Sequence, residues 1–101
     1  MLHIVNKSPA ERNTLDSCLR VSAAGVGGAL LLIEDGVYAA MRGHAFEPRL
    51  REAMGRMKVY VLQPDLDARG IGTAVIEGVE SVDYGGFVDV VAQHKNCQSW
   101  L

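Results

Sequence analysis

Cys18 is the first of two residues in this 101-residue chain that are best suited to covalent chemistry. A sulfur reaction needs a thiolate that is reachable and stabilised by nearby positive charge. Cys18 lies in a stretch expected to be helical, at the boundary of the apolar face of that helix. Its neighbours one helical turn away are all uncharged: Thr14, Leu15, Val21 and Ser22. Local sequence alone therefore favours a buried structural thiol over a reactive one.

Cys97 has surroundings that favour a thiolate more, because His94 and Lys95 precede it. It belongs to residues 95–101, which the sequence predicts to be a short mobile tail. A mobile segment does not hold a reactive group in a productive geometry. Nothing indicates a secreted protein, so both cysteines are expected to be cytosolic thiols.

Metal and cofactor motifs are missing from the sequence. The histidines at positions 3, 44 and 94 are scattered, and Cys18 is far from Cys97, so no short ligand spacing indicates a metal site. The G-x-S-x-G motif of serine hydrolases does not occur. We therefore expect neither a metal nor a cofactor, and His3, inside a predicted strand, is expected to be a packing residue.

Glycine and arginine clusters invite ligand-binding interpretations that their context does not favour. Gly25, Gly27 and Gly28 precede a predicted strand, whereas a dinucleotide loop follows one, so we interpret them as a flexible link. A basic cluster in residues 49–58 is partly offset by two glutamates, and we interpret it as a solvated face. Its members are Arg49, Arg51, Arg56 and Lys58, with Glu47 and Glu52.

The stretch from Ala29 to Met41 organises the predicted fold. Residues 29–33 form an unbroken apolar run that is too short for a lone helix and lacks the alternation of a half-exposed strand. They predict a strand covered on both faces. Glu34, Asp35 and Gly36 end this strand, with Gly36 expected to take a positive φ. Residues 37–41 then predict a short helical segment.

Capping signals and β-branched residues place the other elements. Ser8 and Glu11 form a capping box with Pro9 at the first helical position, which predicts a helix to about Ala24 that ends at Gly25. Residues 71–78 are ambiguous between a loop and a weak strand. The other expected helices are 48–56, 64–69 and 84–94, the last capped by Asp83, and the other expected strands are 2–6, 58–62 and 79–82.

Alternating strands and helices predict one domain over residues 1–101, a three-layer α/β/α sandwich with a mainly parallel sheet of four to five strands. Ligands of such sheets bind beyond the carboxyl ends of the strands. This rim is expected to gather Asn6-Lys7-Ser8, Glu34-Asp35, Gln63 to Asp65, and Asp83-Tyr84. Its mainly acidic character argues against a phosphate site.

Composition narrows the class of partner. The net charge of −2 argues against direct nucleic-acid binding, which needs a basic face. No apolar run approaches the roughly 20 residues of a membrane span, and the N-terminus lacks a signal-peptide core, so a cytoplasmic protein without membrane contact is expected. A hydrophobic fraction of 49% is high for so small a domain and leaves apolar surface for partner chains.

The chain resembles the TusB/DsrH family, and the matching segments follow the family's order almost from end to end. They are Met1 to His3, Asn6 to Pro9, Leu30 to Ala40, Lys58 to Leu62, Asp65 to Gly70, Asp83-Tyr84 with Phe87-Val88, and Trp100. The resemblance implies a small DsrE-like α/β fold. It also implies a subunit of a cytoplasmic sulfur-relay complex that passes persulfide sulfur between cysteines of carrier proteins.

The resemblance implies specific partners as well. Two paralogous subunits, of the DsrE and DsrF or the TusD and TusC type, are expected to join this chain in a heterohexamer. A DsrC- or TusE-type protein is expected to accept the sulfur. The principal sulfur-accepting cysteine is expected on the DsrE or TusD partner, which gives this sulfurtransferase subunit an accessory or scaffold role.

The family serves two routes. TusB-type members serve 2-thiolation of the tRNA wobble uridine, and DsrH-type members accompany dissimilatory sulfur oxidation. Residues 11–13, Leu15 and residues 17–19 resemble the DsrH-type first helix, which carries a cysteine at the position of Cys18. The sequence therefore favours the DsrH type, with the TusB type as the alternative.

Three roles stay open for this subunit. If the subunit carries sulfur, Cys18 is the candidate persulfide cysteine. If it is a scaffold, it shapes a partner's site and has no covalent role. A stand-alone binder of a small ligand is the third hypothesis, which monomeric behaviour would support.

Overall fold

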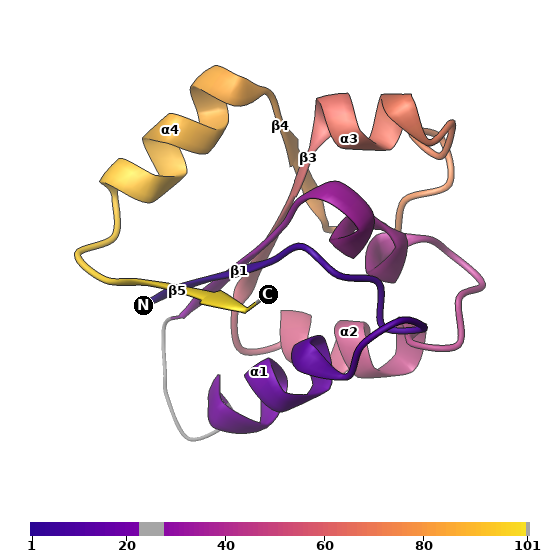
Figure 1. Ribbon diagram of the computed structural model, residues 1–101, viewed down its shortest axis with the longest axis horizontal. Coiled ribbons are helices and arrows are strands. Elements are labelled where there is room, and N and C mark those ends of the chain that lie inside the picture. Colours follow the sequence, from indigo (N-terminus) through magenta and orange to yellow (C-terminus); the bar gives the residue numbers. More distant parts are fainter. Residues whose placement is uncertain (23–27, 101) are drawn as a thin grey trace.

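A five-stranded, all-parallel sheet runs through the computed structural model, which describes residues 1–22 and 28–100 (Figure 1). The spatial order of the strands is β4-β3-β2-β1-β5. Neighbouring strands are in parallel register, with Leu2 opposite Ala29 on one side and opposite Cys97 on the other. The strands are β1 (Leu2–Val5), β2 (Ala29–Leu32), β3 (Lys58–Leu62), β4 (Glu80–Val82) and β5 (Cys97–Trp100).

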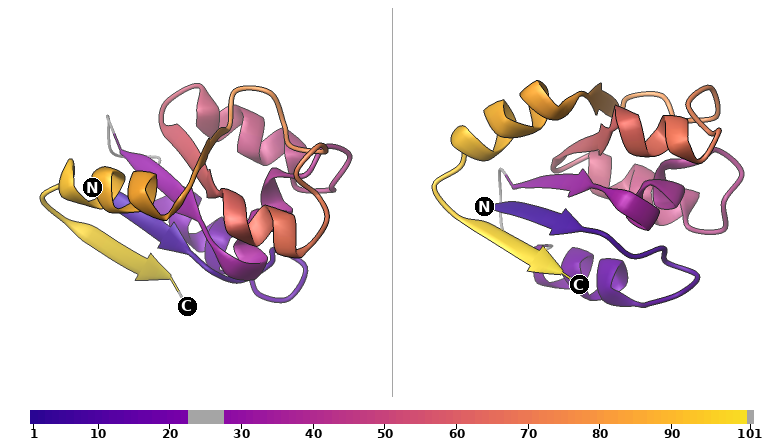
Figure 2. Two further views of the ribbon diagram at one scale, coloured as in Figure 1. Left: turned by 90° about the horizontal axis from the view of Figure 1, so that it is seen from above. Right: turned by 45° about the horizontal axis from the view of Figure 1, so that its top comes forward.

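Helices cover both faces of the sheet, which confirms the predicted three-layer architecture. The steps from β1 to β4 all move in one direction, and right-handed crossovers therefore place the connecting helices on one face. The reverse step from β4 to β5 sends α4 across the opposite face (Figure 2). The helices are α1 (Thr14–Ser22), the 3-10 helix η1 (Glu34–Ala40), α2 (Glu47–Met54), α3 (Gln63–Ala68) and α4 (Tyr84–Ala92).

The central strand β2 is buried along its whole length, as its apolar run predicts. Leu30 and Leu32 face the core beneath α1, η1, α2 and α3. Ala29 and Leu31 face the smaller core beneath α4. A strand buried on both sides has no need of polar residues, and this explains why its sequence does not alternate.

The first helix begins later than the capping box predicts. The carbonyl of Ser8 accepts hydrogen bonds from the N–H groups of Glu11 and Arg12, and its hydroxyl accepts one from Ala10. These bonds close a turn, and α1 itself starts at Thr14. Ser-Pro followed by polar residues suits a turn as well as a helix start, and tertiary packing selects the turn. The predicted end of this helix and the glycine link after it, residues 24–27, lie outside the described residues.

The turn after β2 also differs from its prediction. Glu34 takes the positive φ, 50°, and Gly36 does not. Glycine is needed at position 36 for a different reason, because a Cβ there would clash with the backbone carbonyl oxygen of Val5. The close approach lets η1 begin directly over the end of β1.

The predicted C-terminal tail is wrong, since residues 97–100 form the edge strand β5. The pairing with β1 is reinforced by the side chain of Trp100, whose Nε1 donates a hydrogen bond of 3.1 Å to Nδ1 of His3. His3 is 5% exposed, which confirms its predicted packing role. The sequence does not indicate this strand, because Gln98 and Ser99 are exposed and carry no apolar pattern. The strand depends on contacts with residues far away in the chain.

Protonation of His3 is expected to weaken the attachment of β5. Burial, and then the positive charge of the N-terminus, lower the pKa of His3 below its usual 6.5. The neutral ring that accepts from Trp100 therefore contributes its full stability above pH 6.5, and this contribution falls as the pH drops from 6.5 toward the lowered pKa. The free energy of unfolding, measured by urea titration between pH 7.5 and 5.5, should decrease over that window.

The matched variant for this test is Trp100→Phe, which keeps a ring but removes the donor. The free energy of unfolding of the variant is expected to be lower at pH 7.5, by about 1 kcal/mol for one lost hydrogen bond. At pH 5.5 the variant and the wild type should be closer in stability. A difference that is the same at both pH values would show that the bond to His3 is not pH-linked.

Candidate functional site

The carboxyl ends of the strands bring together several of the rim residues that the sequence predicts there. Glu34, two residues after the end of β2, donates its backbone N–H to Oδ2 of Asp65 in α3 at 2.7 Å. Asn6, directly after β1, lies with its Nδ2 3.5 Å from Oε2 of Glu34. Topology alone predicts this gathering, because parallel strands end at the same edge.

Arg69 links the two elements that carry the rim residues Asp35 and Asp65. Its Nε and Nη2 both donate to Oδ1 of Asp35, at 3.0 and 2.8 Å, and its Nη1 donates to the carbonyl of Asp65. The guanidinium also lies 6.0 Å from the centre of the Tyr38 ring. One arginine thus joins η1 to α3 next to the backbone bond between Glu34 and Asp65.

A pocket of about 370 Å³ opens at this rim. It lies where the chain leaves β3 toward α3 on one face and leaves β4 toward α4 on the other. Parallel α/β sheets bind ligands at such a divergence of their loops. The lining is apolar with a polar margin, and consists of Ile33, Glu34, Leu62, Asp65, Tyr84 and Phe87.

The sequence predicts that Tyr84 lies at the rim, but it does not predict that Tyr84 and Phe87 form the wall of a pocket. The sequence feature that could have indicated this is the helix cap. Asp83 accepts a hydrogen bond of 2.7 Å from the N–H of Gly86, which fixes the start of α4 beside the rim. The first turn of α4 therefore closes the pocket with these two rings.

The six residues that line the pocket include no cysteine, so they offer no thiol that could carry sulfur. Among the described residues there is also no group of three or more histidine, cysteine or acidic side chains that could hold a metal ion. The pocket is suited to binding an apolar or mixed group that another molecule brings to it.

Cys18 lies away from this rim, in the middle of α1. Its side chain is fully buried among the core residues between the sheet and the helices, not at the boundary that its helical position predicts. The reason is that α1 contacts both the sheet and α2, so a wider face of the helix is covered. Burial raises the pKa of the Cys18 thiol to about 12.

Cys97 is exposed at the start of β5, opposite Leu2 in the register. The start of a parallel strand lies at the amino edge of the sheet, and the rim lies at the other edge. The structure therefore brings neither cysteine to the pocket. Both thiols are free.

Comparison with known proteins identifies the family. Residues 7–97 match the family model described as DsrH like protein, which covers most of the chain. The chain belongs to the DsrH-like family. This confirms the resemblance seen in the sequence.

Two curated relatives of this DsrH-like chain carry the name Protein TusB, one from Salmonella dublin and one from Salmonella enteritidis. Each is 42% identical over 74 residues, which cover 73% of this chain and 76% of the relative. The sequence favours a DsrH-type assignment, whereas these relatives fit the TusB-type alternative better.

Two solved structures share the fold of this DsrH-like chain. The ychN protein from E. coli superposes with a TM-score of 0.83 at 22% identity and covers 97% of each chain. A protein of unknown function from Methanobacterium thermoautotrophicum gives a TM-score of 0.77 at 21% identity, over 97% of this chain and 95% of that one. Within the described residues, no helix has the length and apolar character that spanning a bilayer requires.

Proposed function

We propose that this chain is the TusB-type subunit of a cytoplasmic sulfur relay that serves 2-thiolation of the tRNA wobble uridine. The observation that carries the proposal is the 42% identity to proteins named TusB over most of the chain. The rim pocket supports the part of the proposal that gives this subunit a binding role, because its walls are largely apolar and its lining contains no thiol.

In this proposal the chain works within an assembly. Tyr84 and Val88 are 65% and 63% exposed and, at i and i+4, lie on the same outer side of α4. Exposed large apolar side chains beside a pocket are typical of a surface that a partner covers. We propose that paralogous subunits of the TusC and TusD type cover it in a heterohexamer, and that a TusE-type protein accepts the sulfur.

The proposal places the sulfur-accepting cysteine on a partner. The buried Cys18, with its raised pKa, supports a scaffold role for this subunit over a covalent one, because a thiol without thiolate character is a poor sulfur acceptor. A DsrH-type role in sulfur oxidation, with DsrE- and DsrF-type subunits and a DsrC-type acceptor, is the second candidate. It is supported by the family model and by the presence of a cysteine in α1.

The test is genetic restoration of a modified nucleoside. A bacterium that lacks TusB, given this chain together with its two paralogous subunits, is expected to regain 2-thiouridine in its tRNA, measured by mass spectrometry of the digested nucleosides. The same strain given only the paralogous subunits should not. Restoration that fails although the chain assembles with its paralogues would exclude the tRNA route.

Two variants at and just after α4 test whether partners bind the exposed apolar surface of this helix. Val88→Lys introduces a charge into the exposed apolar surface and is expected to weaken assembly by about tenfold or more, with a matching loss of 2-thiouridine. Gln93→Lys, at an exposed position just after the same helix, should leave both unchanged. Normal assembly of the Val88→Lys variant would show that partners bind elsewhere.

A further inference from the structure

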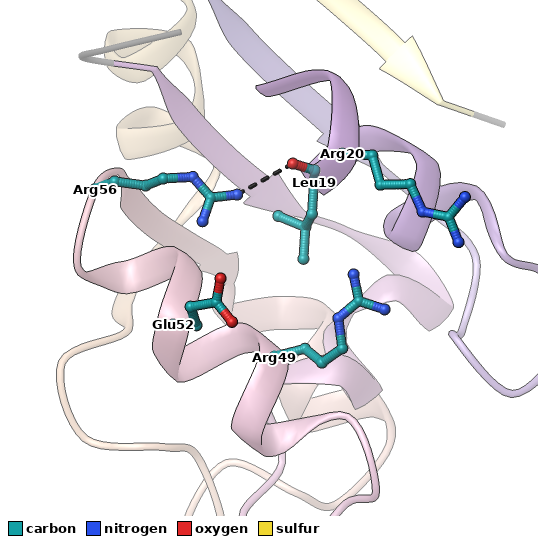
Figure 3. A pocket seen from close by; sticks show the side chains of 5 residues that line it. All are labelled: Leu19, Arg20, Arg49, Glu52 and Arg56. Atoms are coloured by element: carbon teal, nitrogen blue, oxygen red, sulfur yellow. Dashed lines mark hydrogen bonds between the residues drawn. The ribbon is translucent and has the colours of Figure 1, made fainter. Parts of the chain in front are cut away.

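A second pocket, of about 140 Å³, lies between α1 and α2, on the face of the sheet opposite α4 (Figure 3). Its lining contains three arginines and one glutamate. Leu19 and Arg20 come from α1, and Arg49, Glu52 and Arg56 come from α2 and the turn that follows it. The sequence predicts the basic cluster that contains Arg49 and Arg56 to be a solvated face, because two glutamates partly offset it. The pocket forms only where α1 and α2, which are far apart in the chain, lie together.

Asp16 neutralises part of the positive charge of this pocket. Its two carboxylate oxygens pair with Arg20, at 2.7 Å, and with Arg49. Arg49 also stacks over the ring of Phe46, with its guanidinium carbon 5.5 Å from the ring centre. These contacts hold two of the three guanidinium groups in place, and a fixed guanidinium loses little entropy when it binds a further anion.

Among the three arginines of this pocket, Arg56 is the one without a carboxylate partner in the described part of the chain. Its Nη2 donates to the carbonyl of Leu19 at 3.1 Å, a contact drawn in Figure 3. Its Nε is buried and has no acceptor, and within the described part of the chain no acidic side chain lies at ion-pair distance from it. A half-buried guanidinium with an unsatisfied donor has lost hydration without gaining a counter-charge, so an anion beside it is strongly favoured.

The charge of the pocket selects the kind of anion. Three arginines against Asp16 and Glu52 leave a net charge of +1. Glu52 lies on the wall between Arg49 and Arg56 and repels a second negative charge (Figure 3). We propose that this pocket binds one carboxylate side chain, an aspartate or glutamate, from a segment of a partner protein.

A nucleic-acid phosphate fits these observations less well. Binding to a phosphate backbone needs a stripe of cations that follows several phosphates, and it scales with their number. This pocket offers a single site with a carboxylate in its wall, on a chain of net charge −2. A carboxylate, which is planar and singly charged, matches the guanidinium fork at one point.

The test follows the side-chain Nε–H signal of Arg56 by NMR in the isotope-labelled full chain, with unlabelled paralogous subunits added where they keep it in solution. The probe is a short peptide with one glutamate flanked by glycines. Its matched control carries glutamine instead. The glutamate peptide is expected to shift the Arg56 signal in a saturable way, and the glutamine peptide is not.

Charge variants of the pocket are expected to change the affinity for the glutamate peptide in opposite directions. Glu52→Gln removes the repulsion and is expected to tighten binding about two- to fivefold, while Arg20→Gln should weaken it by a similar factor, the range for partly exposed ion pairs. Glu77→Gln and Arg12→Gln change the same charges at exposed positions outside the pocket and should leave the affinity unchanged. If the pocket and control variants had equal effects, the binding would depend on the overall charge of the surface and not on this pocket, and the proposal would be overturned.

Two further results would also overturn it: no saturable shift at Arg56, or tighter binding of a short single-stranded RNA than of the glutamate peptide. The readout does not depend on tRNA thiolation or on assembly through α4. Failure of the carboxylate site is therefore distinguishable from failure of the proposed function.

Discussion

Cys18 is expected to react with iodoacetamide at least about 100-fold more slowly than Cys97 in the native chain at neutral pH. The thiolate is the reacting species, and a pKa of about 12 leaves only about one Cys18 side chain in 100,000 ionised at neutral pH. The side chain is also fully buried, so the reagent reaches it only when α1 opens. Cys97 is exposed on the edge strand and serves as the internal reference.

The labelling rates are measured by mass spectrometry, in the free chain and in the assembly with its paralogous subunits. In concentrated urea both cysteines should react at similar rates, which controls for the reagent. The result that would contradict a scaffold role is rapid labelling of Cys18 within the assembly, because a partner would then have to expose and ionise it.

A persulfide donor provides the functional half of this experiment. A sulfur-carrying Cys18 thiolate would attack the outer sulfur of the donor, form a new S–S bond and release the donor as a thiol, so that this chain gains the mass of one sulfur atom. We expect no such gain at Cys18. Cys18→Ala is expected to leave sulfur transfer through the complex unchanged, and alanine is preferred over serine because a buried hydroxyl without a partner would destabilise the core.

The sheet could be predicted from the sequence because its central strands carry their own signal. The run from Ala29 to Ile33 has no polar residue, which predicts a buried strand, and the segment Lys58–Leu62 is rich in β-branched and aromatic side chains. The edge strand β5 lacks such a signal. Its backbone pairing with β1 is reinforced by the bond between Trp100 and His3, two residues at opposite ends of the chain.

The sequence predicts which residues meet at the rim, but it does not predict that they line a pocket. Parallel topology dictates that residues after each strand meet at one edge, and the contact between Glu34 and Asp65 confirms this. The pocket also needs Tyr84 and Phe87 of α4 in its wall, and the packing of α4 on the sheet is tertiary. The arginine pocket escaped prediction for the same reason, since it exists only when α1 and α2 pack side by side.

Gly36 is the position where a single added carbon is expected to have the largest effect on stability. The Cβ of an alanine there would clash with the carbonyl oxygen of Val5 and lie 3.1 Å from its carbonyl carbon. This oxygen cannot move aside, because it accepts a hydrogen bond of 3.0 Å from the N–H of Ile33. Gly36→Ala is therefore expected to lower the free energy of unfolding by about 3 kcal/mol, the upper part of the range for overpacking.

The control is Gly85→Ala, which adds the same carbon in the first turn of α4. Its nearest neighbour there is Oδ1 of Asp83 at 3.4 Å, an ordinary contact, and alanine favours a helix over glycine, so this variant should be as stable as the wild type or more stable by up to about 1 kcal/mol. Urea unfolding of both variants at pH 7.5 gives the comparison. A Gly36→Ala variant within about 0.5 kcal/mol of the wild type would show that η1 does not press against the end of β1.

The same substitution also tests how the rim is held. If η1 moves away from β1 to relieve the clash, Glu34 moves with it, and the hydrogen bond from its N–H to Asp65 lengthens or breaks. The rim pocket would then lose one wall while α4 and its exposed apolar surface stay in place. Gly36→Ala protein that remains folded at low temperature is therefore expected to assemble through α4 yet give less 2-thiouridine than the wild type. Full activity of an assembled Gly36→Ala variant would show that the rim pocket takes no part in the relay.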